Sequence, residues 1–360
     1  MRIQTIKAED AVGKVLSHDI TKVVKGESKG VPFKKGHIVK AEDVSELLKI
    51  GKENIYILDL DPNDVHEDEA GVRLGTALAG TGTTWTGPKE SRVDLYADCD
   101  GLLKINVHAL EEINDLPDVI LSTLPNNMVV HKGELLAGTK VIPLVVNEQT
   151  ICTAETICRQ AGWVIKVIPF QKVQVGVVIT GSEVYKKRIR DEFGPVMTEK
   201  VHSFGSNILR IDYAPDDTEL IATKIKKMAE DGASIIFVTG GMSVDPDDVT
   251  PNAIRLSGAK VEKYGAPALP GAMFMLAYLE DIPIMGVPAC GMFFNITIID
   301  LILPRLLAGE RVTRKDIVAL AHGGLCRACP KCTYPNCTFG KGTSYSSKDS
   351  YYACIKADHN

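Results

Sequence analysis

Three short glycine-containing segments follow apolar runs in the sequence, and their residue types suit the binding of an anion. They are 180–183 (TGSE), 239–251 (TGGMSVDPDDVTP) and 287–292 (VPACGM). Glycine lets the backbone approach a ligand closely, and the turn into a following helix presents free N–H groups to a phosphate. Asp247 and Asp248 could instead simply cap a helix, as carboxylates do in any α/β protein. Three such segments in one region favour an anion-binding site.

A run of cysteines near the end of the chain is a second group of residues that could do chemistry. Cys326, Cys329, Cys332 and Cys337 have the spacing C-x₂-C-x₂-C-x₄-C. These short intervals let four thiolates converge on one centre, and in a reducing compartment such a cluster favours a metal over disulfides. Four thiolates can hold a [4Fe–4S] cluster or a tetrahedral Zn²⁺, and the spacing leaves both open. The surrounding segment is rich in Gly, Pro and Lys, so we expect the metal to supply its folding energy.

The elements that must position the three glycine segments are buried strands that alternate with helices. The expected strands are 173–180, 208–213, 234–241, 259–263 and 282–287, and the expected helices are 195–207, 219–230, 249–257 and 294–307. This alternation predicts a mostly parallel sheet covered on both faces. In such sheets ligands bind beyond the carboxyl ends of the strands. The glycine segments all follow strand ends, so we expect them to lie at one edge.

The motifs of this region resemble a known family. TGSE after the first strand, and TGG-x-S followed by DD-x-TP after a later one, are similar to the molybdopterin-binding domain of molybdopterin adenylyltransferases and molybdotransferases. The resemblance covers about 173–308, with the motifs in the family's order and spacing. It implies a three-layer α/β fold, an oligomer, and binding of the dithiolene pterin and its phosphate at these segments.

The resemblance also implies roles for individual residues. The implied ligand-binding residues are Thr180, Gly181, Ser182, Thr239, Gly240, Gly241, Ser243 and Pro288, and the implied catalytic carboxylates are Glu183, Asp191 and Asp248. Several carboxylates near an anionic ligand require a divalent cation between them, and Mg²⁺ with oxygen ligands fits that role. Asp217 matches a further family carboxylate less closely, and its alternative role is to start the following helix.

Two departures from the family pattern leave the activity open. The third segment reads Pro288-Ala289-Cys290-Gly291-Met292, where the molybdotransferases have a PGNP-like turn, and the family's Ser-Ala-Met-Asp-Gly segment is missing. The first hypothesis is a Mg²⁺-dependent transferase that inserts molybdate in a late step of molybdenum-cofactor synthesis. The second is a non-catalytic carrier or sensor of molybdopterin with a C-terminal metal cluster. Cys290 could contact molybdenum or simply fill space, and space-filling is the favoured interpretation.

The composition and the pattern of apolar residues divide the whole chain into three expected regions. We expect a mixed α+β region at 1–170, the α/β domain at 171–310 and a Cys-rich extension at 311–360. In the first region, helices are expected at 66–79 and 148–161 and a loop at 81–91.

Composition excludes some classes of partner. The chain has 360 residues and a net charge of −5, which argues against a general nucleic-acid binder. No apolar run approaches the roughly 20 residues of a membrane helix, and the first ten residues resemble no secretory signal. We therefore expect a cytoplasmic homo-oligomer that takes a pterin and molybdate and serves a recipient molybdoenzyme.

Overall fold

The computed structural model describes residues 2–22, 30–59, 63–89 and 91–342 and contains two compact units. The first comprises Met1–Cys99, Lys104–Leu124 and Lys132–Val167, and the second comprises Asp100–Leu103, Pro125–His131 and the chain from Ile168 onward. The Cys-rich segment and the α/β region thus share one unit, while the three-part division of the sequence stays a prediction. No helix in the described ranges has the length and apolar character that crossing a bilayer demands.

The second unit is built on a six-stranded sheet with the order β16-β15-β17-β20-β19-β18. Its strands are β15 (Gln174–Thr180), β16 (Asn207–Ala214), β17 (Ile235–Thr239), β18 (Lys260–Tyr264), β19 (Met275–Leu279) and β20 (Ile282–Val287). The pairings β15–β16, β15–β17 and β17–β20 are parallel, whereas β19–β20 and β18–β19 are antiparallel. The carboxyl ends of β15, β17 and β20 therefore meet at one edge, as the alternating pattern predicts.

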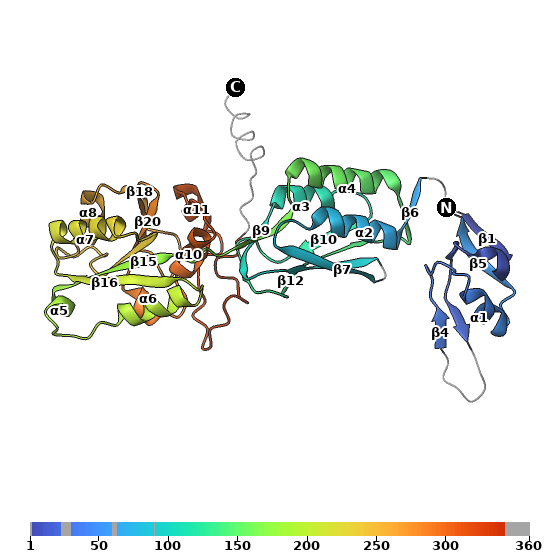
Figure 1. The fold of residues 1–360 in the computed structure, drawn as a ribbon, viewed down its shortest axis with the longest axis horizontal. Coiled ribbons are helices and arrows are strands. Elements are labelled where there is room, and N and C mark those ends of the chain that lie inside the picture. The colour runs from blue at the N-terminus through green and yellow to red at the C-terminus, as the bar shows by residue number, and fades with distance from the viewer. Residues whose placement is uncertain (1, 23–29, 60–62, 90, 343–360) are drawn as a thin grey trace, which may run out of the picture. The chain divides into compact units, whose positions relative to one another are not determined.

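Helices cover both faces of this sheet (Figure 1). The helices of this unit are α5 (Ser182–Tyr185), α6 (Phe193–His202), α7 (Thr218–Glu230), α8 (Thr250–Leu256), α9 (Cys290–Phe293), α10 (Ile299–Leu307) and α11 (Arg314–Ala319). Val177 and Phe237 enter the core formed with α6 and α10, while their neighbours Val178 and Val238 enter the core formed with α7 and α8. Because both faces are buried, these strands are continuous apolar runs without alternation. The predicted α/β class is confirmed.

Three elements of this unit differ from the prediction. The helix expected at 195–207 ends at His202, and β16 already begins at Asn207. β19, within the apolar run at 272–279, was not predicted, and it turns back into β20 through Glu280, whose φ is +53°. The helix expected at 294–307 begins only at Ile299, because residues 294–298 form the irregular connection between α9 and α10. The Thr297 hydroxyl accepts a hydrogen bond from the Ile299 N–H at 3.2 Å, which fixes the later start.

The Cys-rich segment packs against the core of the same unit. Phe339 is only 2% exposed and lies in the core with α10 and α11. The Tyr334 hydroxyl donates a hydrogen bond to the carbonyl oxygen of Asp300 at 3.2 Å, and the Cys326 N–H donates to the carbonyl oxygen of Leu269 at 2.8 Å. The segment was expected to depend on metal for its folding energy, but these contacts supply a share of it without metal.

Most of the remaining elements of the described chain belong to the first unit. They are β1 (Arg2–Lys7), η1 (Ala8–Ala11), β2 (Val15–Leu16), β3 (Ile20–Lys22), β4 (Gly30–Phe33), α1 (Asp43–Lys49), β5 (Asn54–Asp59), β6 (Asp64–His66), α2 (Glu67–Leu78), β7 (Thr83–Lys89), β8 (Arg92–Ala97), α3 (Val107–Asn114), β10 (Val119–Thr123), β12 (Leu135–Val141), β13 (Val145–Asn147) and α4 (Glu148–Ala161). β11 (Val129–Val130) belongs to the second unit, and β9 (Gly101–Ile105) and β14 (Ile165–Pro169) each have residues in both units. The expected helices at 66–79 and 148–161 are confirmed as α2 and α4. The loop expected at 81–91 is wrong, because Thr83–Lys89 forms an edge strand of the sheet β10-β12-β8-β7. Its threonines and tryptophan favour a strand, and an edge strand tolerates the Pro and Gly that suggested a loop.

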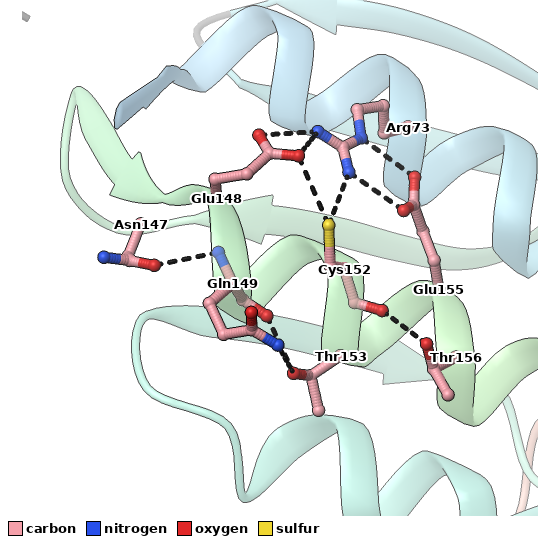
Figure 2. Close-up of polar contacts among 8 residues, drawn as sticks. All are labelled: Arg73, Asn147, Glu148, Gln149, Cys152, Thr153, Glu155 and Thr156. Carbon is pink, nitrogen blue, oxygen red and sulfur yellow. Dashed lines mark hydrogen bonds and ion pairs between the residues drawn. The ribbon is translucent and has the colours of Figure 1, made fainter. Parts of the chain in front are cut away.

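An arginine joins the two long helices of the first unit (Figure 2). Arg73 on α2 donates hydrogen bonds to both carboxylate oxygens of Glu155 on α4, at 2.8 and 2.9 Å. It also donates to both oxygens of Glu148, each at 2.9 Å, and lies 3.5 Å from the sulfur of Cys152. The hydrogen bonds from Arg73 hold the pKa of the Glu155 carboxyl below its usual value. The arrangement is a two-carboxylate ion pair that fixes α2 against α4.

We predict that Arg73→Met lowers the melting temperature at neutral pH by roughly 3 °C. The folded-state pKa of Glu155 is depressed, so its contribution to stability is complete above about pH 4.3, the usual glutamate pKa. That contribution is lost as the pH falls through the lower folded-state pKa. Thermal unfolding from pH 7 to pH 3 should therefore show the difference between variant and wild type shrinking. Arg92→Met, which breaks the exposed pair with Asp94, is the control. An equal drop in melting temperature in both variants would contradict the stabilising role given to the Arg73–Glu155 pair.

Candidate functional site

Three buried threonines join the ends of β15 and β17 to the start of α8. The Thr180 hydroxyl donates a hydrogen bond to the carbonyl oxygen of Thr239 at 3.0 Å. It also lies 3.1 Å from the hydroxyl of Thr250, which can act as the donor in that pair. The first two glycine segments, predicted to share one sheet edge, are thus in direct contact. Thr250 belongs to the DD-x-TP motif but was not among the predicted site residues.

Thr239 has a hydroxyl oxygen that is buried and makes no hydrogen bond to any described residue. An unsatisfied buried polar atom is costly, on the order of 1–3 kcal/mol, and native proteins rarely leave one without a reason. This hydroxyl lies at the end of the strand from which the TGG segment emerges. A ligand at this edge that accepts or donates a hydrogen bond would remove the cost.

Gly240 and Gly241 have no room for a side chain. Gly240 has a φ of +88°, and a Cβ there would lie 2.5 Å from the carbonyl oxygen of Thr180. Gly241 has a φ of +55°, and its Cβ would lie 2.9 Å from the Thr250 hydroxyl. Only glycine adopts such angles without strain. The backbone of the second segment is therefore pressed against the end of β15 and the start of α8.

The rest of the second segment folds back on itself. Asp248 accepts a hydrogen bond from the Asp245 N–H at 3.0 Å, and the Tyr264 hydroxyl donates to the carbonyl oxygen of Met242 at 2.7 Å. Ser243 and Asp247 are exposed at its rim. Burial is the main cause that raises the pKa of Tyr264, and the negative charge of Asp248 is the second cause. The alternative that the two aspartates cap α8 is wrong, since its N-cap residue is Val249 and no side chain caps it.

The first segment is held by an aspartate that was not predicted. Asp216 accepts a hydrogen bond from the Ser182 N–H at 2.9 Å, and its own N–H donates to the Ser182 hydroxyl at 3.4 Å. Gly181 has a φ of +132°, and a Cβ there would lie 2.8 Å from a carboxylate oxygen of Glu183. Asp217 instead accepts a hydrogen bond from the Leu220 N–H at 2.9 Å, so it caps α7. The alternative that Asp217 starts a helix is the correct one.

Asp191 is used by the fold itself. Its carboxylate accepts hydrogen bonds from the N–H groups of Phe193 and Gly194 at 2.8 and 3.1 Å. It also accepts one from the Tyr213 hydroxyl of β16 at 3.0 Å. Burial is the main cause that raises the pKa of Tyr213, and the hydrogen bond to Asp191 is the second cause. Asp191 therefore fixes the start of α6 against the sheet.

The predicted carboxylates do not form a ready-made metal site. Within the part of the chain that the structure describes, no three Asp, Glu, His or Cys side chains lie close enough to hold one ion. Mg²⁺ is commonly held by only one or two carboxylates together with water and phosphate oxygens of a substrate. Glu183 and Asp248, which follow the ends of β15 and β17, suit that mode, and Asp191 is already engaged.

The third segment follows β20 through a buried proline, Pro288. The Gly291 N–H donates a hydrogen bond to the carbonyl oxygen of Pro288 at 2.9 Å, which closes the turn into α9. Burial raises the pKa of the Cys290 thiol. This shift disfavours the thiolate form that a metal binds, and the space-filling role of Cys290 stays a prediction.

A run of positive charge follows Glu183 directly and was not predicted as part of the site. Lys186, Lys187, Arg188 and Arg190 are all exposed. The N–H of Arg188 donates to the carbonyl oxygen of Glu183 at 2.8 Å, so the run starts close to the first segment. Four positive charges within five residues at this position suit an anionic ligand.

The four clustered cysteines line one cavity of about 260 Å³. Cys329 and Cys332 are exposed, whereas Cys326 and Cys337 are partly buried. Segment 293–296, which starts at the last residue of α9, lines the same cavity.

The α/β region matches a known family. Residues 176–308 match the family model described as "Probable molybdopterin binding domain". This domain belongs to the molybdopterin-binding family. The assignment from TGSE, TGG-x-S and DD-x-TP to this family is thereby confirmed. Residues 5–59 match a second model, "Domain of unknown function (DUF8806)".

Individual relatives cover only parts of the chain. A CinA-like protein of Mycobacterium leprae is 31% identical over 77 residues, which is 21% of this chain and 18% of the relative. The chain thus matches about a fifth of the length of that curated relative. The molybdopterin biosynthesis enzyme MoaB of Thermus thermophilus is 16% identical, with 38% of this chain and 98% of that one covered and a TM-score of 0.32. A molybdenum cofactor biosynthesis protein of Pyrococcus furiosus is 12% identical, with coverages of 86% and 66% and a TM-score of 0.26.

Proposed function

We propose that the α/β domain binds molybdopterin, or its adenylated form, at the three glycine segments and inserts molybdate in a Mg²⁺-dependent step. The observation that carries the proposal is the contact of the two glycines with the ends of the strands. Gly240 and Gly241 are pressed against Thr180 and Thr250, beside the unsatisfied hydroxyl of Thr239. Such a backbone surface at the carboxyl ends of parallel strands suits a phosphate and a polar ring system.

In this proposal each predicted residue has a defined part. Residues that bind the pterin and its phosphate are Thr180, Gly181, Ser182, Thr239, Gly240, Gly241, Ser243 and Pro288. Glu183 and Asp248 would hold Mg²⁺, which would supply neutralisation of the negative charge on the phosphate and the molybdate. Asp191 is a positioning residue, because its carboxylate fixes α6 and the Tyr213 hydroxyl. The protein contributes mainly positioning and charge neutralisation, as in phosphoryl transfer generally.

Withdrawal of Mg²⁺ tests the proposed mechanism. With adenylated molybdopterin and molybdate as substrates, EDTA is expected to abolish AMP release, and added Mg²⁺ should restore it. A parallel sample receiving Mg-EDTA in place of EDTA controls for effects of the chelator itself. Full activity in EDTA would contradict a role for the ion.

A non-catalytic carrier or sensor is the second candidate. It is favoured by the third segment, whose sequence departs from the family's turn, and by the hydrogen bonds of Asp191 to the first N–H groups of α6. A carrier would bind the same ligand with a stoichiometry of one and release no AMP. Comparison of binding with turnover on one preparation separates the two candidates.

The proposed partners follow from the same site. They are molybdopterin, molybdate and a recipient molybdoenzyme, with the chain acting as a homo-oligomer in the cytoplasm. A net charge of −5 gives no reason to add a nucleic acid to these partners.

The basic run after Glu183 is expected to speed ligand capture. Changing Lys186, Lys187, Arg188 and Arg190 to glutamine should lower the association rate of molybdopterin about tenfold at low salt, with little effect at high salt. Stopped-flow fluorescence at several salt concentrations measures this. The charge-matched control changes Lys14, Lys40, Lys49 and Lys52, which belong to the first unit. Equal slowing by both variants would contradict a local role.

A further inference from the structure

The four clustered cysteines are not used by the proposed pterin site, and their surroundings indicate a site of their own. They surround one cavity of about 260 Å³, whose remaining wall includes Phe293 and Phe294. Phe293 is 77% exposed and Phe294 is 45% exposed. Cysteines gathered round a cavity with an apolar wall provide soft sulfur ligands and partial exclusion of water.

The segment that carries the cysteines is fixed at both ends and irregular between them. Leu325 bridges to Leu269, and the Cys326 N–H donates to the Leu269 carbonyl oxygen. At the other end Phe339 is buried in the domain core. From Arg327 to Lys331 the backbone forms neither helix nor strand. The two fixed ends hold Cys326 and Cys337 in place, while the intervening backbone is free of secondary structure that would resist a shift of Cys329 and Cys332.

We propose that Cys326, Cys329, Cys332 and Cys337 bind a thiophilic metal centre in this cavity, and that its binding orders segment 293–296 beside the third glycine segment. Four thiolates are the ligand set of both Zn²⁺ and a [4Fe–4S] cluster. In the described ranges no three such side chains yet lie within reach of one ion. Loading therefore brings the two exposed thiolates inward to the two partly buried ones, with release of the thiol protons.

The cavity wall connects this centre with the pterin-binding edge. Segment 293–296 starts at the last residue of α9, and α9 begins two residues after Pro288. Lys200 of α6 donates hydrogen bonds to the carbonyl oxygen of Asn295 at 3.0 Å and to the carboxylate of Asp300 at 2.6 Å. Segment 293–296 is thus held by α6 on one side and lines the cysteine cavity on the other. Closing the cavity round a metal limits the freedom of this segment.

Metal content and hydrogen exchange test the proposal without any pterin ligand, so its failure is distinguishable from failure of the proposed function. Wild-type protein is purified in parallel with Zn²⁺ in air, and with iron and sulfide without oxygen. The expected result is one zinc, or four iron and four sulfide, per chain in one of the two arms. Metal-loaded protein should also show slower amide exchange than metal-free protein in 293–296 and 327–332.

The decisive variant is the double change Cys329→Ser with Cys332→Ser. Both side chains are exposed, so the metal-free melting temperature should be unchanged while metal binding falls at least 100-fold. Cys99→Ser, which lies outside the cluster, is the control and should keep full metal content. Wild-type protein that takes up no metal in either arm, a double variant that keeps it, or a Cys329–Cys332 disulfide in the reduced preparation would overturn the site. Metal binding with unchanged exchange in 293–296 would overturn the ordering of that segment.

Discussion

Gly240→Ala is expected to weaken molybdopterin binding by at least 100-fold while the domain stays folded. A Cβ at this position would lie 2.5 Å from the carbonyl oxygen of Thr180 and 2.9 Å from its hydroxyl. The φ of +88° is also strained for alanine. The backbone must move away from β15, which displaces the surface proposed to hold the pterin phosphate. A shift of this kind is sufficient for the loss, because each tenfold change in affinity is only about 1.4 kcal/mol.

Gly232 provides a matched control for this change. Its φ is +95°, close to that of Gly240, but a Cβ there meets no atom within 4 Å. Gly232→Ala should therefore lower the melting temperature through backbone strain and leave ligand affinity unchanged. Fluorescence titration below the melting temperature of both variants makes the comparison. Equal affinity in the two variants would show that the Gly240 backbone does not contact the ligand.

Asp248→Asn is expected to lower the rate of AMP release by about 100- to 1,000-fold. The asparagine amide oxygen can still accept the hydrogen bond from the Asp245 N–H, so the loop keeps its shape and loses only the charge. If Asp248 holds Mg²⁺, the loss should fall on kcat and be reduced at high Mg²⁺ concentration. Rates measured across a range of Mg²⁺ concentrations check this.

Asp247→Asn removes the same charge one residue away and serves as the control. Asp247 is exposed at the rim of the segment, and its change should lower the rate by less than threefold. If Asp248→Asn and Asp247→Asn lower the rate of AMP release equally, both effects would be due to the overall negative charge of the loop and not to a metal ligand. An unchanged rate in both variants would remove Asp248 from the proposed site.

Sequence reasoning was most successful where burial alone determines the pattern. β15 and β17 are apolar and β-branched throughout because both faces of each strand are covered, and their bounds were predicted within two residues. Sequence reasoning failed where one residue pattern is compatible with two kinds of secondary structure. The apolar run containing β19 has no alternation, so periodicity cannot separate a buried strand from a buried helix. β7 was taken for a loop because turn residues are also tolerated at a sheet edge.

The same distinction holds for the site. Gly240 and Gly241 were predicted because a TGG motif after a buried strand is a local signal of close backbone approach, and the structure gives both a positive φ. Asp216 and Thr250 were missed because their roles depend on partners 34 and 70 residues away in the chain. Asp191 was assigned to the ligand, yet its hydrogen bond to Tyr213 shows a structural task that no local pattern indicates. Motifs identify the loops, but tertiary contacts determine which of their residues support the fold and which are available to a ligand.

The most direct test of this account is the release of AMP from adenylated molybdopterin by the anaerobically purified chain with Mg²⁺ and molybdate. The released cofactor is assayed by reconstitution of a cofactor-free molybdoenzyme. The account predicts many turnovers per chain, with active molybdenum cofactor formed in proportion to AMP. No AMP release beyond one per chain, together with no cofactor able to reconstitute the enzyme, would contradict it.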